Sequence, residues 1–149
     1  MKTVNKFDIS LLILRIVLGI VIFAHGGQKL FGWFGGYGFE GTMNFFTQTI
    51  GLPSVLGFLI VIEESLGMLA LIFGFLSRIV SGALIVVMTG AFVTTHWAHG
   101  FFMNWFGNQA GEGFEYDLLV FAMAAVIVIC GPGIYSVDSL LPKKWMTKK

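Results

Sequence analysis

Cysteine and charge are both scarce in this sequence. Its single cysteine, Cys130, cannot form an internal disulfide, and no paired-cysteine motif is present for thiol redox chemistry or for zinc. Only 11% of the 149 residues are charged, against roughly 25% in soluble domains. A net charge of +1 provides no basic stripe for nucleic acid, and no GxGxxG segment follows a strand pattern. An ordinary soluble domain, a nucleic-acid binder and a dinucleotide-binding fold are therefore excluded.

Hydrophobic residues make up 56% of the chain and fall in long blocks. A bilayer core about 30 Å thick requires roughly 20 helical residues to cross it. None of the blocks shows the two-residue alternation of a barrel strand, so each is predicted to satisfy its own backbone hydrogen bonds as a helix. Four blocks meet this requirement, at about residues 9–31, 53–75, 78–97 and 114–130.

These blocks predict an all-α fold: an integral membrane four-helix bundle, with residues 1–149 forming a single domain. The first block has a basic start but is too long for a signal peptide, and no small-residue cleavage site follows it. We expect it to be retained as the first helix.

Lysine and arginine indicate the orientation, because basic residues in short loops favour the cytoplasm. Lys29 alone falls at the opposite end of the predicted bundle. Both termini are therefore predicted to be cytoplasmic, with the two longer loops outside. The residues that define the cytoplasmic end are Lys2, Lys6, Arg78, Lys143, Lys144, Lys148 and Lys149.

Charged residues fall well inside the first two predicted spans: Arg15 in the first, and Glu63 and Glu64 in the second. An ionisable group at bilayer depth costs several kcal/mol and usually faces the bundle interior. Because the two helices run antiparallel, Arg15 is predicted to pair with one of the glutamates as a structural ion pair. Adjacent helical residues point about 100° apart. The second glutamate is therefore left to carry protons or bind a ligand, unless both serve structure alone.

Polar groups also converge on the outer side. His25 and Lys29 lie one helical turn apart and share a face. His96 and His99 end the third span, and Glu115 begins the fourth. Taken alone, Lys29 is explained by extension of its side chain to the lipid headgroups, and His25 by a backbone hydrogen bond. Taken together, they predict a pocket with ligand-binding or proton-exchanging groups at its rim. The candidate site residues are His25, Lys29, Glu63, Glu64, His96 and Glu115.

Several segments, in order, resemble the DoxX family of small four-helix membrane proteins. The similarity spans Leu11 to Asp138. The segments are "LLILRIVLGIVIFAHGGQKLFGWFGG", "EGTMNFF", "IEESLGMLALIFG", "SRI", "HGFF", "GEGFEYDLL" and "GPGIYSVD".

This resemblance implies a multi-pass protein of a bacterial or archaeal cytoplasmic membrane that is associated with redox chemistry. Relatives are described as subunits of quinone-linked oxidoreductases, as partners in oxidative-stress complexes, or as proteins that detoxify quinones. If electrons move, a bound quinone, a metal centre or a partner subunit must carry them. The positions implied by the resemblance are Arg15, His25, Lys29, Glu63, Arg78, His96 and Glu115.

Three hypotheses for function remain open from the sequence. The leading one is a redox-associated membrane protein or subunit that binds a quinone or small aromatic molecule in the outer half of the bundle. The second is a haem or metal protein with ligands from His25, His96 and His99, since imidazole suits iron, copper and zinc. The third is a non-enzymatic scaffold or small-solute permease, for which a homo-oligomer would compensate for the small number of helices.

Overall fold

The computed structural model describes residues 5–141. The first long helix, α1 (Lys6–Phe31), begins after Asn5, whose side chain accepts a hydrogen bond from the Phe7 amide. It ends at Gly32, whose φ of 74° is left-handed and therefore suits glycine. The prediction of a helix at about residues 9–31 is confirmed.

The second long helix is continuous but changes its winding in the middle. It consists of α3 (Ser54–Ile62), the π-helical segment η3 (Glu63–Gly67) and α4 (Met68–Phe73). Gly74, with φ 73°, ends it. The predicted helix at about residues 53–75 is confirmed, although its π turn was not predicted.

The third long helix also contains a π turn. It consists of α5 (Ser77–Ala91), the π segment η4 (Phe92–His96) and the short 3₁₀ segment η5 (Trp97–His99). The last long helix, α6 (Glu115–Cys130), has 16 residues and matches the prediction of about 114–130.

Three of these helices are long and apolar enough to cross a bilayer: Lys6–Phe31, Ser54–Phe73 and Ser77–His99. At 16 residues, α6 is roughly 24 Å long, which is shorter than the hydrocarbon core. The fourth crossing therefore stays a prediction. Residues 5–141 contain no strand, so the described chain is all-α.

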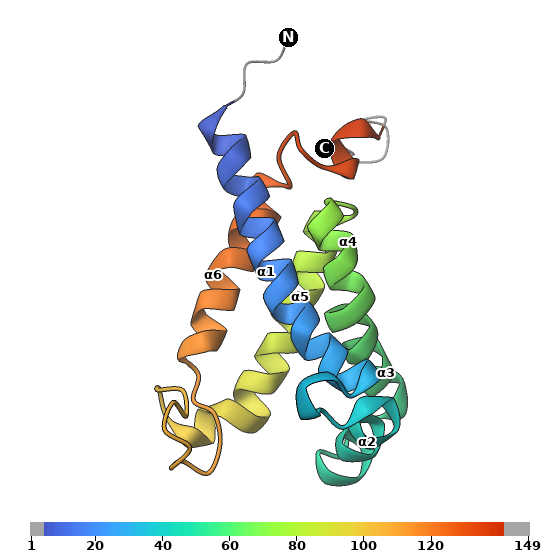
Figure 1. Cartoon of the computed structure of the whole chain (residues 1–149), viewed down its shortest axis with the longest axis vertical. Coiled ribbons are helices and arrows are strands. Elements are labelled where there is room, and N and C mark those ends of the chain that lie inside the picture. Colours follow the sequence, from blue (N-terminus) through green and yellow to red (C-terminus); the bar gives the residue numbers. More distant parts are fainter. Residues whose placement is uncertain (1–4, 142–149) are drawn as a thin grey trace.

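The long helices run alternately up and down (Figure 1). Helix α1 packs antiparallel to η3 and α4, and α6 packs along α5. The loop before α6 lies at the lower end of Figure 1, as do η1 (Trp33–Gly35), α2 (Gly38–Asn44) and η2 (Phe45–Thr49). The start of α1 and the segment after α6 lie at the upper end.

Two glycines allow α1 to approach the second long helix closely. A Cβ added at Gly19 would lie 2.5 Å from the Ile72 side chain, and one at Gly26 would overlap the Glu64 carbonyl. Small residues at such contacts are typical of helices that pack in membranes. The contacts fix the register, placing Gly19 beside Ile72 and Gly26 beside Glu64.

The segment after α6 folds back over the upper end of the bundle. Its short helix η6 (Val137–Leu140) contains Asp138, whose carboxylate accepts hydrogen bonds from the amides of Leu76 (2.8 Å) and Ser77 (2.9 Å) at the start of α5. The Asp138 amide donates to the Gly74 carbonyl at 2.8 Å. We call residues 131–141 the C-terminal clasp, because they join α6 to the turn between α4 and α5.

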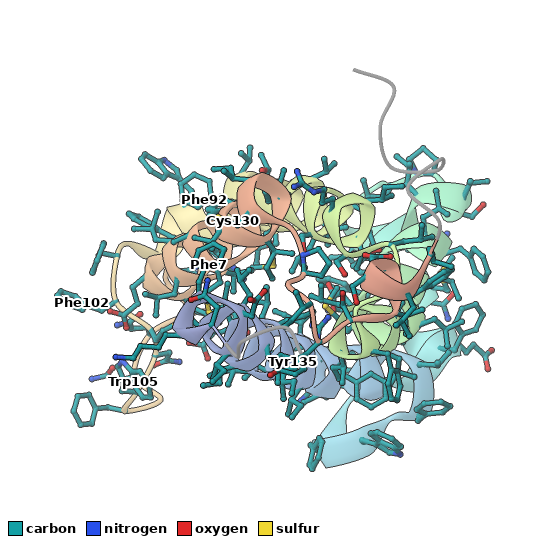
Figure 2. All side chains as sticks on the ribbon, turned by 90° about the horizontal axis from the view of Figure 1, so that it is seen from above. Phe7, Phe92, Phe102, Trp105, Cys130 and Tyr135 are labelled. Carbon is teal, nitrogen blue, oxygen red and sulfur yellow. The ribbon has the colours of Figure 1, made fainter. Side chains whose placement is uncertain are left out.

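The outward faces of the long helices are apolar. Large aliphatic side chains such as Ile20, Ile79, Val86 and Ile129 are exposed. Aromatic residues gather on the loop before α6, and Figure 2 shows Phe102 and Trp105 on this loop at the edge of the molecule, outside the helices. A surface of this kind matches lipid around the helices and an aromatic belt at the membrane interface.

Candidate functional site

Lys29 and Glu64 form an ion pair between α1 and η3. The Glu64 side chain is only 8% exposed and that of Lys29 is 28% exposed. The pair forms because Gly26, one turn before Lys29, lets the two backbones meet at Glu64. Lys29 therefore has a partner within the bundle, which extension to the headgroups alone does not account for.

The predicted ion pair between Arg15 and either Glu63 or Glu64 is also wrong. The Arg15 guanidinium donates a hydrogen bond to the Tyr135 carbonyl in the clasp at 2.6 Å. The cause is depth: Arg15 precedes Gly26 by eleven residues, or roughly 16 Å of helix. This places Arg15 beside Gly74, which follows α4, whereas the glutamates lie in η3 before α4.

Glu63 points away from the pair formed by its neighbour. Its carboxylate lies over Gly67, where an added Cβ would be 2.6 Å from Oε2. Its Oε1 atom is buried and has no hydrogen-bond partner within residues 5–141. A ligand-binding or proton-exchange role for Glu63 stays a prediction.

A second acid–base pair joins the third long helix to α6. The Nδ1 atom of His96, in η4, lies 2.7 Å from Oδ2 of Asp117. The Asp117 side chain is fully buried, and its Oδ1 atom has no partner in the described part of the chain. A buried carboxylate of this kind holds the imidazole ring in one orientation.

His25 and Tyr116 lie between the two pairs. Their ring centroids are 6.0 Å apart. His25 lies one turn before Lys29 on α1, and Tyr116 adjoins Asp117 on α6, so the two neighbouring rings connect one pair to the other. The buried Tyr116 hydroxyl has no partner among residues 5–141.

Together these groups form one cluster, contributed by α1, η3, η4 and α6. We call it the polar cluster, and its members are His25, Lys29, Glu64, His96, Tyr116 and Asp117. It brings together four of the six predicted site residues. Acids, bases and a phenol in contact within an apolar bundle can accept, hold and pass protons.

Glu115 lies outside the cluster. Its Oε1 atom accepts hydrogen bonds from the Met103 amide and the Trp105 indole, both at 3.0 Å, so it holds the loop before α6. Tyr116 and Asp117 are the two cluster residues that the list of candidates lacks. The signal for Asp117 was its spacing, because it is three residues before the buried Val120, on the α6 face that continues into the core.

The three histidines do not converge. Nδ1 of His99 lies 2.8 Å from the Thr95 carbonyl, and His96 faces Asp117. Within residues 5–141, no group of three or more His, Cys, Asp or Glu side chains is placed to hold a metal ion. The alternative centre built from His25, His96 and His99 is therefore contradicted.

Both pairs depend on π turns. Glu64 lies in η3 and His96 in η4. A π turn contains an extra residue and appears frequently at functional sites. In η3, the polar residues Glu64 and Ser65 are buried in an otherwise apolar helix. In η4, His96 contacts the buried Asp117.

An all-α chain with three apolar spans and a buried acid–base cluster defines a multi-pass membrane protein. The model of the DoxX family matches residues 10–97, more than half of the chain, and the protein belongs to this family.

Two relatives extend the similarity beyond these residues. "Putative oxidoreductase CatD" of Bacillus subtilis (strain 168) is 30% identical over 139 residues, covering 93% of this chain and 92% of that protein. "Inner membrane protein YqjF" of Escherichia coli (strain K12) is 30% identical over 138 residues, covering 93% of this chain and 96% of that protein. No solved structure gives a significant match.

Proposed function

We propose that this protein is a redox-associated membrane subunit that binds a quinone or small aromatic molecule in the half of the bundle that holds the polar cluster. The observation that carries this proposal is the convergence of six proton-exchanging groups from four helical segments. If the two ion pairs only stabilised the fold, His25 and the Tyr116 phenol would not be needed beside them. The name of the Bacillus subtilis relative, which includes the word oxidoreductase, supports the redox assignment.

The chemistry assigned to the cluster is proton supply. Reduction of a quinone to its hydroquinone consumes two electrons and two protons. The His96–Asp117 pair and His25 serve as the source of the protons, while Lys29 and Glu64 compensate the charge. The two electrons come from a partner subunit with a reduced flavin or iron–sulfur centre, because the chain has no paired thiols of its own.

The proposed setting is the cytoplasmic membrane, with α6 as a fourth crossing and both termini on the cytoplasmic side. Lys6 begins α1 and Arg78 lies in the first turn of α5. Both helices start at the upper end in Figure 1, which supports this orientation. The polar cluster then lies in the outer half of the bundle. The proposed partners are redox subunits, and a second copy of the chain is a further candidate.

The proposal is tested by purifying the protein in lipid nanodiscs. Lipid-soluble compounds are extracted and identified by mass spectrometry, and binding of 2-methyl-1,4-naphthoquinone is measured by calorimetry against empty nanodiscs. We expect either co-purified quinone or saturable binding of the added compound. Absence of both would overturn the proposal.

The role of His25 is tested by His25→Leu, which keeps bulk and removes both ring nitrogens. We expect a folded protein whose affinity for the naphthoquinone falls about tenfold, the equivalent of one hydrogen bond. His99→Leu is the matched control, because His99 lies outside the polar cluster, and it should retain binding. A His25→Leu variant that loses thermal stability but binds normally would make His25 a packing residue.

A further inference from the structure

A cavity of about 330 Å³ lies against Lys29, between the end of α1 and the segment that contains α2 and η2. Two glycines and six larger residues line it: Gln28, Lys29, Tyr37, Thr42, Phe45 and Phe46. Small-molecule pockets start at roughly 300 Å³, and a cavity of about 150 Å³ holds benzene. The space therefore admits one substituted ring or two fused rings.

Thr42 is the unusual residue in this lining. It is 3% exposed, and its hydroxyl has no hydrogen-bond partner in the part of the chain that the structure describes. Other threonines in these helices bond back to the preceding turn. Thr47 donates to the Met43 carbonyl at 2.9 Å and Thr89 to the Ile85 carbonyl at 2.7 Å.

A buried hydroxyl without a partner costs about 1–3 kcal/mol. Thr42 lines a cavity with aromatic walls from Phe45 and Phe46. An oxygen acceptor on a ring bound there would give its buried hydroxyl a partner. Such a ligand needs a flat apolar body and at least one acceptor at its edge.

Lys29 connects the cavity to the polar cluster. It lines the cavity and is ion-paired with Glu64. A ring oxygen that accepts a hydrogen bond from Lys29 is therefore linked, through Lys29, to the Glu64 carboxylate of the polar cluster. Tyr37, which is 79% exposed, lies at the open side.

We propose that this cavity is the binding site for a one- or two-ring aromatic carbonyl compound or phenol, with Thr42 and Lys29 as the hydrogen-bond donors to its oxygens. This inference rests on the proposed function, which assigns an aromatic ligand to this half of the bundle. It adds the site, the two donors and the size of the ligand. A polyprenyl tail, where one is present, extends outside the cavity.

The test is Thr42→Val, which keeps the shape of the side chain and removes its hydroxyl. Because that hydroxyl has no partner in the described chain, the variant should unfold at the same temperature as the wild type. Its affinity for 2-methyl-1,4-naphthoquinone in nanodiscs should fall about tenfold. Thr47→Val is the matched control, since Thr47 does not line the cavity, and it should bind normally.

A second probe separates hydrogen bonding from shape. The hydrocarbon 2-methylnaphthalene has no oxygen, so Thr42→Val should bind it as the wild type does. Equal weakening for both probes would overturn the assignment of Thr42 as a donor.

Failure of the site and failure of the function have different signatures. Unchanged naphthoquinone affinity in Thr42→Val, with loss in His25→Leu, would overturn the cavity and retain the proposed function. No binding of the naphthoquinone by the wild-type protein would overturn both.

Discussion

Arg15, Lys29 and His96 each contact a group at their own depth in the bundle. Glu63 is the exception, because its buried Oε1 atom has no partner among residues 5–141. Arg15 contacts the clasp at the upper end, while Lys29 contacts Glu64 and His96 contacts Asp117 in the lower half. An unpaired charge at bilayer depth is costly, so the effect of a substitution depends on the partner that it leaves behind.

Lys29→Met is expected to destabilise the protein by about 2 kcal/mol, because Glu64 stays buried without its counter-ion. Adding Glu64→Gln should recover much of the loss, since the remaining group is neutral. Thermal unfolding in detergent would measure both variants. Lys6→Met, at the exposed start of α1, is the control and should be neutral. Equal stability for Lys29→Met and Lys6→Met would show that the ion pair contributes nothing.

At the scale of the helical element, the close contact between α1 and η3 determines where the cluster forms. It requires Gly26, because a side chain there would meet the Glu64 backbone. Not every glycine in the spans has such a role. Around Gly82, in α5, an added Cβ has nothing within 4 Å.

Gly26→Ala should therefore separate the two helices and cost about 2–3 kcal/mol, as overpacking does in a core. Gly82→Ala carries the same substitution into open space and should be neutral, or stabilising by up to about 1 kcal/mol through helix propensity. Thermal unfolding of the two variants side by side gives the comparison. Equal effects would mean that the contact at Gly26 is not tight.

The clasp acts on a different element, the start of α5. Asp138→Ala removes the acceptor for two amides, one of them on the buried Ser77, and should cost about 1–3 kcal/mol. Asp138→Asn keeps one side-chain oxygen and should lose less. Glu40→Ala, at an exposed position in α2, is the control. Chemical denaturation would rank the three variants, and an Asn variant as unstable as the Ala variant would argue against the graded loss of acceptors.

For the whole molecule, the open question is which end faces the cytoplasm. In a Cys130→Ser background, single cysteines introduced by Gln48→Cys and Ala110→Cys lie on the two exposed segments at the lower end. Both should react with an impermeant maleimide in intact cells, whereas Leu140→Cys, in the clasp, should react only after lysis. The reverse pattern would place the polar cluster and the cavity in the cytoplasmic half.

The sequence predicts the helices well because hydropathy is a local property. It locates the span from α3 to α4 to within a residue or two, and it places His25 and His96 on the same side of the membrane. It does not predict which charged side chains form pairs. The partner of Lys29 depends on the register between two antiparallel helices, which Gly26 determines through a contact 38 residues apart. Thr42 could not be identified either, because a missing hydrogen-bond partner is a property of the folded chain.

The two π turns have a consequence for how the sequence of these spans is displayed. Each adds one residue to its helix, so the residues after it are offset by about 100° from the phase set before it. A single helical wheel drawn through residues 54–73 therefore superimposes two different wheels. Residues aligned on such a diagram, one before position 63 and one after position 67, face different neighbours in the protein.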